Sequence, residues 1–146
     1  MLVEINIVLN ELLVKLFKDI SEIEERAIQT EEFKGVTTND VHVIEAIGVG
    51  QAKNMSSVAK VLNVTMGTLT ISVNSLVKKG YVQRVRSEED RRVVLVSLTD
   101  SGKRAFEHHK KFHDKMIQAV IKELSEDEKT VLEKALTNLS DFFKKM

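Results

Sequence analysis

The feature of the sequence that most restricts the fold is a change in hydrophobic periodicity near residue 80. Before this point, apolar residues recur at three- and four-residue spacings, which is typical of amphipathic helices. Over residues 81–86 and 93–98 the pattern changes to the period of two that half-buried strands show. The six residues between these runs, 87–92, are all polar and predict the tip of a hairpin. We therefore expect one small β-hairpin within a helical protein.

Local signals place six helices around this hairpin. Thr37 and Asp40 have the spacing of a capping box, as do Ser125 and Glu128, and each pair marks the start of a helix. The sequence Lys78-Lys79-Gly80 has the cations and the glycine that commonly end one. The predicted helices run over residues 2–27, from the Thr37 cap to Gly48, over 55–63 and 66–79, from the Thr99 cap to about Leu124, and over 126–144.

The helices at 55–63 and 66–79 flank Asn63, a residue type that tolerates a left-handed turn. Two short helices around such a turn, followed by a hairpin, predict a winged helix-turn-helix. Residues of the second helix can be placed at 100° intervals, and Thr70 then falls near the edge of the outer face. The inward residues are Leu69, Val73, Leu76 and Val77. The outward residues are Gly67, Thr68, Ile71, Asn74, Ser75 and Lys78.

Composition excludes several classes of protein. The chain has no Cys, so it has no disulfide framework, no Cys-based zinc finger and no cysteine nucleophile. With 42% hydrophobic residues it is not disordered by composition. No run is long and apolar enough for a membrane span, and the start carries Glu4 and Glu11 and lacks the basic region of a signal peptide. We expect a soluble cytoplasmic protein.

A zero net charge conceals a strong asymmetry along the chain. Residues 1–54 hold five Lys and Arg against ten acids, a net charge of −5, whereas residues 55–104 hold nine against four, a net charge of +5. Residues 105–146 hold eight of each. This distribution predicts a polyanionic partner for the middle of the chain alone, the other interpretation being chance clustering on a solvated face.

In a winged helix-turn-helix the second helix enters the major groove, and the hairpin tip reaches the neighbouring minor groove. Ile71, the outward apolar residue, either meets a thymine methyl group or packs against another element of its own fold. Asp90 can pair with Arg92 across the hairpin tip and orient it. The hairpin carries four arginines, a residue type suited to phosphates and narrow minor grooves: Arg84, Arg86, Arg91 and Arg92.

The run from Val64 to Lys103 resembles the core of MarR-type transcriptional regulators. LVKKGYVQR resembles the exit of their recognition helix, Asp90-Arg-Arg92 resembles a wing-tip D-x-R motif, and Leu98-Thr-Asp-Ser-Gly102 resembles the LTxxG start of the next helix. Flanking helices of suitable length extend the resemblance over nearly the whole chain. The resemblance implies a mainly α fold with a small β-wing, in which a winged helix-turn-helix core is flanked by long dimerisation helices.

The same resemblance implies a single domain over residues 1–146, with the DNA-binding core at 36–104 and dimerisation helices at 1–34 and 105–146. The wide apolar stripes of the outer helices also favour a homodimer, since they exceed what one small winged domain can cover. The expected partner is double-stranded DNA with an inverted-repeat operator. The implied DNA-binding residues are Thr65, Gly67, Thr68, Thr70, Ile71, Asn74, Ser75, Lys78, Arg84, Arg86, Arg91 and Arg92.

A longer stretch, NSLVKKGYVQRVRSEEDRRVV, with the His-rich helix and LTNLSDFF, is similar to the subgroup that represses fatty-acid synthesis genes in Gram-positive bacteria. This similarity implies long-chain acyl carrier protein as a co-repressor. We place the effector pocket where the helix opened by Thr37 meets the dimerisation helices. Its expected lining is Phe17, Ile20, His42, Phe106, His109 and His113.

The histidines leave an alternative open. His109 and His113 stand four residues apart on one helix, and His42 lies on another. This is metal-ligand spacing, but it also suits a hydrogen-bonded cluster in a partly buried core. His108 faces the opposite side of its helix and is expected to be solvated.

The arrangement resembles the zinc site of zinc-sensing members of the same family, where positions matching His42, His109 and His113 bind the metal. Glu24 or Glu25 would complete four ligands. The preferred interpretation has no cofactor, and zinc is the alternative.

We expect a sequence-specific transcriptional repressor and no enzymatic activity, because the sequence has no G-x-S-x-G elbow and no P-loop. A zinc-sensing repressor is one alternative. A helical interaction protein that does not bind DNA is another, and retention on DNA at moderate salt would distinguish it.

Overall fold

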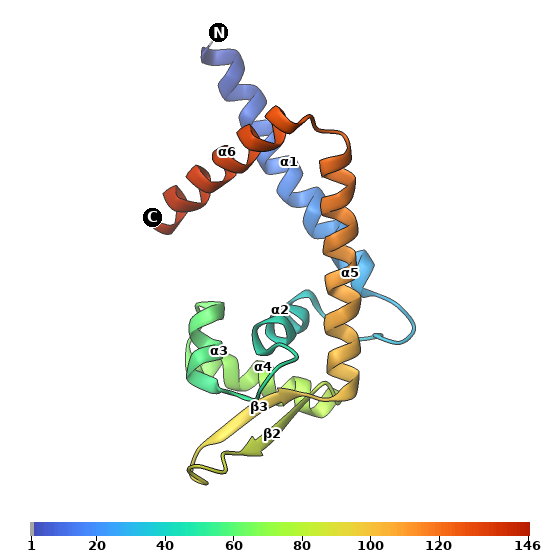
Figure 1. The fold of residues 1–146 in the computed structure, drawn as a ribbon, viewed down its shortest axis with the longest axis vertical. Helices are drawn as coiled ribbons and strands as arrows, with labels where there is room; N and C mark the ends of the chain where they lie inside the picture. Colours follow the sequence, from blue (N-terminus) through green and yellow to red (C-terminus); the bar gives the residue numbers. More distant parts are fainter. Residues whose placement is uncertain (1) are drawn as a thin grey trace. The chain divides into compact units, whose positions relative to one another are not determined.

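Figure 1 shows the fold in the computed structural model, which describes the backbone of residues 2–146 and the side chains of residues 4–146. Met1, the first residue of two predicted ranges, lies outside the described residues. The fold is mainly helical with a small wing, so the predicted fold class is confirmed. In chain order the elements are α1 (Leu2–Ile28), α2 (Thr38–Ile47), β1 (Lys53–Asn54), α3 (Met55–Leu62), α4 (Met66–Lys79), β2 (Val82–Arg86), β3 (Val94–Leu98), α5 (Asp100–Lys122) and α6 (Glu126–Lys144).

The chain forms two compact units, residues 1–110 and residues 111–146. The first contains every element from α1 to β3 and the start of α5. The second contains the end of α5 and the whole of α6.

The core of the first unit is built mainly by α2, α3, α4 and the wing. Leu69, Val73 and Leu76 of α4 are fully buried, as predicted, and Val77 is half-buried beside them. They pack with apolar residues of α2 and α3, such as Ile44. Burying an aliphatic side chain of this size stabilises a fold by about 1.5–3 kcal/mol. This packing fixes which face of α4 remains available to a partner.

Capping residues set the ends of the two short helices of the helix-turn-helix. Asn54 caps α3, and Asn63 after it adopts the left-handed conformation with φ 54° and ψ 48°. Thr65 then caps α4 by accepting a hydrogen bond from the Thr68 backbone nitrogen at 3.1 Å. Gly80 ends α4 with a positive φ of 88°. The predicted turn and the predicted bounds of α4 are therefore confirmed.

The wing is part of a three-stranded antiparallel sheet in the order β1-β3-β2. Strands β2 and β3 form the predicted hairpin, with Val82 opposite Leu98. In β3, buried Val96 and Leu98 alternate with less buried residues, as a period of two requires. In β2 only Val82 is buried, and the rest of the strand is exposed, so the alternation predicted for this strand is not seen. Strand β1 was not predicted; it pairs Lys53 with Val96.

Close hydrogen bonds connect the end of α4 to the start of α5. The Thr99 hydroxyl donates to the Gly80 carbonyl oxygen at 2.6 Å, and the Thr99 nitrogen donates to the Tyr81 carbonyl oxygen at 3.1 Å. The Gly102 nitrogen donates to the Thr99 hydroxyl oxygen at 3.1 Å. A Cβ atom at Gly102 would lie 2.1 Å from the Tyr81 carbonyl oxygen, so only glycine fits. This contact gives the LTxxG motif a physical basis.

The second unit carries a large exposed apolar surface. Ser125 and Glu128 form the predicted capping box at the start of α6. A groove of about 320 Å³ between α5 and α6 is lined mainly by aliphatic residues, and Phe142 and Phe143 are exposed near the end of α6. Within the described residues, no helix is both long and apolar enough to cross a membrane.

Candidate nucleic-acid interface

The recognition helix α4 presents a small and partly apolar outer face. Ile71 is 73% exposed, which makes it the most exposed large apolar residue of this helix. Gly67, Thr68, Asn74 and Lys78 are exposed too, as predicted. Two predictions need adjustment: Ser75 is half-buried, and Thr70, placed near the edge by the helical wheel, is exposed.

Several polar atoms on this face are bonded within the protein. The Thr70 hydroxyl donates to the Met66 carbonyl oxygen at 2.8 Å, a contact one turn back along the same helix. The Thr65 hydroxyl donates to the Thr68 hydroxyl oxygen at 3.0 Å. Hydroxyl groups held in this way are less available to read base edges.

A hydrogen bond joins the recognition helix to the wing. The Arg84 guanidinium of β2 donates through Nη2 to Oδ1 of Asn74 on α4. Both residues were predicted to contact DNA, but their contact with each other was not predicted. Ten residues separate them, and only the fold of the hairpin back onto the helix brings them together.

The wing tip holds Arg92 in a defined orientation. Its Nε and Nη2 atoms donate to the two carboxylate oxygens of Asp90 at 3.0 and 3.1 Å, and its backbone nitrogen donates to Oδ1 at 3.1 Å. The predicted contact between these residues is therefore present. The side-chain hydrogen bond from Arg92 lowers the pKa of Asp90, and the same bond raises the pKa of Arg92. The Arg92 side chain is nevertheless 91% exposed.

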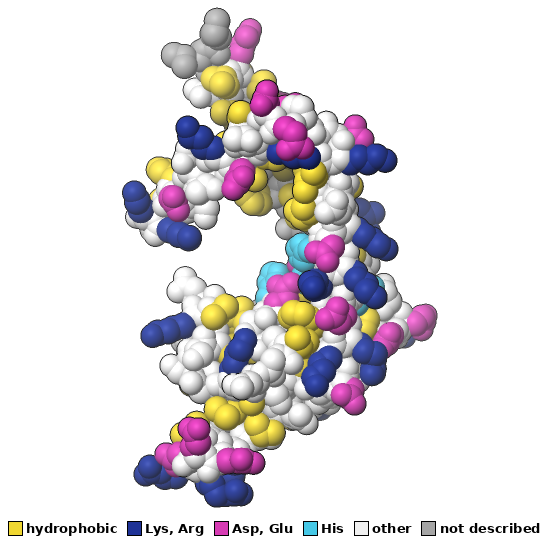
Figure 2. Space-filling model, viewed as in Figure 1, with side chains coloured by type: hydrophobic (Ala, Val, Ile, Leu, Met, Phe, Trp, Pro, Cys, Tyr) yellow, Lys and Arg dark blue, Asp and Glu magenta, His cyan; other side chains and the backbone are white. Residues whose placement is uncertain are grey.

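The other wing arginines complete a charged tip. Arg86 donates through Nη1 to the Arg91 carbonyl oxygen at 2.8 Å, which closes the hairpin loop, and Arg91 is exposed. Figure 2 shows basic and acidic side chains gathered at this tip, at the lower end of the view. The tip thus offers cations to an anionic partner, with acids interspersed among them.

An ion pair between a buried carboxylate of α2 and a partly exposed lysine of α4 was missed by sequence reasoning. Asp40 is only 4% exposed, and its Oδ2 lies 2.6 Å from Nζ of Lys79 at the end of α4. The same oxygen accepts from the Thr37 nitrogen at 3.0 Å in the capping box of α2. Lys79 also donates to the Gly35 carbonyl oxygen at 3.0 Å. Of the two lysines that end α4, Lys79 is therefore structural and Lys78 faces outward.

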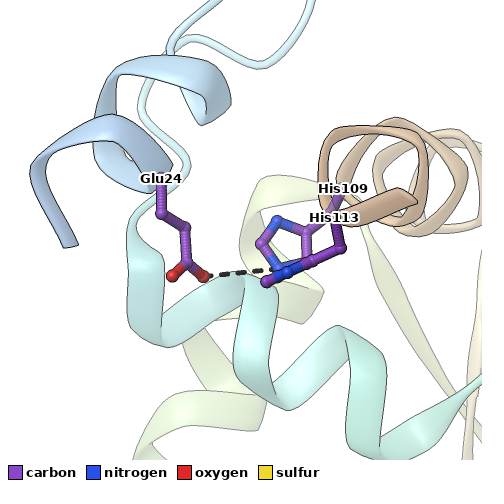
Figure 3. Close-up of side chains that lie close together, drawn as sticks. All are labelled: Glu24, His109 and His113. Carbon is purple, nitrogen blue, oxygen red and sulfur yellow. Dashed lines mark ion pairs between the residues drawn. The ribbon is translucent and has the colours of Figure 1, made fainter. Parts of the chain in front are cut away.

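A cluster of histidine and carboxylate side chains joins α1, α2 and α5 in the first unit. His109 is 1% exposed, and its Nε2 lies 2.9 Å from Oε1 of Glu45 and 3.3 Å from Oε1 of Glu24. The same Glu24 oxygen lies 3.3 Å from Nε2 of His42, which is half-exposed. Figure 3 shows Glu24 with His109, and His113 one helical turn further along α5. The predicted proximity of His42, His109 and Glu24 is therefore present, and Glu45 is an addition.

The remaining residues of the predicted effector pocket have different surroundings. Phe106 is half-buried against the core, whereas Phe17 and Ile20 are exposed on α1. His42 also borders a pocket of about 130 Å³ behind the recognition helix. The other residues lining it come from α2, α3, α4 and the turn before α4: Asn39, Val43, Leu62, Val64, Thr68, Leu69 and Ser72. The effector pocket stays a prediction.

The expectation that His108 is solvated is wrong. Its Nε2 lies 2.8 Å from the Ala27 carbonyl oxygen at the end of α1, and its ring centroid lies 5.2 Å from that of Phe33. The helical wheel considers one helix at a time. It did not show that the end of α1, 81 residues earlier, covers that side of α5.

Two short helices with an outward recognition face, followed by a wing with an oriented arginine, define a DNA-binding transcriptional regulator of the MarR type. The profile of the family of transcriptional regulators SarA/Rot matches residues 27–109. The chain belongs to this family.

Individual relatives agree with this assignment. The fold is similar to that of Streptococcus pneumoniae FabT in a crystal structure with DNA: the TM-score is 0.88, the identity is 42%, and the match covers 94% of this chain and 96% of that one. The regulator SarZ of Staphylococcus haemolyticus is 34% identical over 104 residues, 71% of this chain and 69% of SarZ. The HTH-type regulator YpoP of Bacillus subtilis is 30% identical over 98 residues, and the chain spans 66% of its length.

Proposed function

We propose that the chain is a repressor that binds an inverted-repeat operator as a homodimer. The observation that carries the proposal is the outward face of α4 beside a wing whose Arg92 is held by Asp90 and exposed. In a two-fold dimer, two such recognition helices lie roughly 34 Å apart, one helical turn of DNA. The exposed apolar residues along α1 and in the second unit support a dimer. The likeness to FabT, solved with DNA, supports the DNA partner.

Footprinting on captured genomic fragments tests this proposal. We expect protection of two half-sites related by inversion, with centres about 10 base pairs apart. The affinity should fall steeply as salt rises, because phosphate contacts release counterions. Protection of a single half-site by a monomer would contradict the homodimer, and binding without sequence preference would contradict a specific repressor.

We further propose that the regulated genes serve fatty-acid synthesis and that long-chain acyl carrier protein is the co-repressor. The stretch NSLVKKGYVQRVRSEEDRRVV and the 42% identity to FabT support this proposal. The cluster of Glu24, His42, Glu45 and His109 supports this proposal, since it joins α1 and α5 to α2, and α2 packs against the recognition helix α4 in the core. A ligand shifts the protein between two states only by its difference in affinity for them.

Operator affinity with and without the acylated carrier protein tests the co-repressor. We expect long-chain acyl carrier protein to tighten binding several-fold, and the carrier protein without an acyl chain to have no effect. A chelator should leave the affinity unchanged. Equal affinities with both forms of the carrier protein would contradict the proposal while leaving operator binding intact.

A specific observation also favours zinc as a second candidate effector. One oxygen of Glu24 lies 3.3 Å from a ring nitrogen of His42 and from one of His109, and imidazole and carboxylate groups are common zinc ligands. A zinc ion would be held by these three residues, with His113 as the predicted fourth ligand. Because imidazole must be neutral to bind zinc, binding would weaken in acid. Loss of operator binding with a chelator, restored by micromolar zinc, would establish this alternative.

A further inference from the structure

The outer face of α4 is short of groups that read bases by hydrogen bonds. Residues 66–79 contain no Arg, Gln, Asp or Glu, so several common base-reading side chains are absent from the helix. Of its two lysines, Lys79 is bonded to buried Asp40. Lys78 is therefore the cation that this helix can offer to DNA.

The polar groups that remain are mostly engaged inside the protein. The Thr70 hydroxyl donates to the Met66 carbonyl oxygen, and the Thr68 hydroxyl oxygen accepts from Thr65. The acceptor oxygen of Asn74 is bonded to Arg84. When a threonine hydroxyl is bonded to its own helix, its methyl group is left as the part that a partner can meet.

Ile71 is the most exposed large apolar side chain on this face. It is 73% exposed, although a branched aliphatic side chain of this size is usually buried. The alternative that Ile71 packs against another element of its own fold does not hold in the first unit, given this exposure. An exposed isoleucine between Gly67 and Lys78 on the outward face of α4 can therefore meet an apolar group of a partner.

We infer that Ile71 reads the C5-methyl group of a thymine in each operator half-site, an inference that rests on the proposed operator binding. Thymine is the one base whose major-groove edge carries a methyl group. Contact between this methyl group and the isoleucine removes both from water. Burying one methyl group is worth about 0.8 kcal/mol, which corresponds to a roughly fourfold change in affinity.

The test replaces thymine by deoxyuracil, one position at a time, in a duplex selected by the wild-type protein from a random library. Uracil lacks only the methyl group, so pairing and the O4 acceptor are unchanged. We expect a roughly fourfold loss of affinity at one thymine position per half-site, and no significant loss at the others. For Ile71→Ala, thymine and uracil at that position should bind equally.

Val61→Ala is the matched control, because Val61 is also an exposed aliphatic residue, 72% exposed on α3. It should retain the wild-type preference for thymine over uracil. If every uracil substitution is neutral, or if Ile71→Ala keeps the preference, the inference is overturned while operator binding stands. If no sequence is enriched from the library, the proposed function itself fails, and the inference with it.

Discussion

The absence of a side chain at Gly102 determines how closely α5 approaches the end of the recognition helix. The atom that a Cβ would meet is a backbone oxygen, that of Tyr81, which also accepts a hydrogen bond from Thr99. A backbone atom held in this way cannot move aside as a flexible side chain would. The joint between α4, the wing and α5 therefore requires glycine at position 102.

Gly102→Ala should lower the free energy of unfolding by about 1–3 kcal/mol, the range for overpacking a well-packed site. Urea denaturation would measure the change. Gly67→Ala is the control, because a Cβ there would find its nearest neighbour, the Thr65 hydroxyl oxygen, only 4.0 Å away. Alanine also favours a helix, so this variant should be neutral or slightly more stable. An equal loss of unfolding free energy in both variants would show that the close approach at Gly102 does not contribute to stability.

Arg92→Ala should weaken operator binding by about 1–3 kcal/mol and leave folding intact, since the hairpin tip buries no apolar side chain. Asp90→Asn should also weaken binding, although it removes a negative charge, because Asp90 holds Arg92 in place. Glu88→Gln removes an exposed acid from the same tip and should bind as well as wild type or better. Fluorescence anisotropy at fixed salt would compare the three. Stronger binding by Asp90→Asn would mean that charge, not orientation, is what matters.

The pH dependence of this contact follows from the direction of the pKa shift. Because the hydrogen bond from Arg92 lowers the pKa of Asp90, the carboxylate stays charged throughout the ordinary titration range of aspartate and to a lower pH. The contact is lost only as the pH falls through that lowered pKa. The effect of Asp90→Asn on operator binding should therefore be constant between about pH 5 and 8, a range that lies above the ordinary aspartate pKa.

At the scale of elements, the two lysines that end α4 divide their roles. Lys79→Ala removes the cationic partner of buried Asp40 and should cost about 1–3 kcal/mol of stability. Lys78→Ala should leave stability unchanged and weaken binding modestly and uniformly across sequences, as loss of a phosphate contact does. Thermal denaturation and operator titration of both variants would separate the roles. The reverse pattern would contradict the structural assignment.

Acid should destabilise the start of α6, at a pH set by the pKa of Glu128 in its capping box. Hydrogen bonds from the Ser125 backbone, and secondarily from its side chain, lower the pKa of Glu128. A lowered pKa means that the cap stabilises α6 above the ordinary glutamate range and is lost as the pH falls through the lowered value. Carboxyl NMR titration should give Glu128 a pKa below the ordinary glutamate range. A pKa of Glu128 within the ordinary glutamate range would contradict the contact.

The elements that could be predicted are those whose signals are local. The bounds of α4 follow from Thr65 and Gly80, which act within one turn of the helix. Strand β1 could not be predicted, because two residues paired through their backbone leave no periodic pattern. The contact between Asp40 and Lys79 spans 39 residues, so it depends on how α2 packs against α4.

In the candidate site, too, features with local signals could be predicted, and contacts between distant elements could not. Helical spacing places Ile71 outward, and the two-residue separation of Asp90 and Arg92 predicts their contact. The environment of His108 depends on where α1 ends, and the addition of Glu45 to the His109 cluster depends on α2. A sequence pattern gives the direction of a side chain from its own element, but it does not identify what covers that side chain.

At the scale of the whole molecule, the exposed apolar residues of α1 and of the second unit predict a dimer in solution. Sedimentation at micromolar concentration should give twice the chain mass. Leu12→Lys and Leu136→Lys, each in an exposed apolar row, should shift the protein toward monomer and weaken operator binding, since binding is linked to assembly. Val61→Lys, also at an exposed aliphatic position, should remain a dimer. A monomeric wild type would refute this expectation.

The hydrogen bond between Arg84 and Asn74 has a consequence for how operators should be described. It couples a strand of the wing to the recognition helix, so in the proposed complex with DNA a base change that moves Asn74 would also alter the setting of Arg84. Losses of binding free energy from several base changes add up only when the positions act independently. A model that adds one independent energy for each base position would then predict the wrong affinity for operators that differ both near α4 and near the wing. In the proposed complex, we expect selection for a new operator to change Asn74 and Arg84 together.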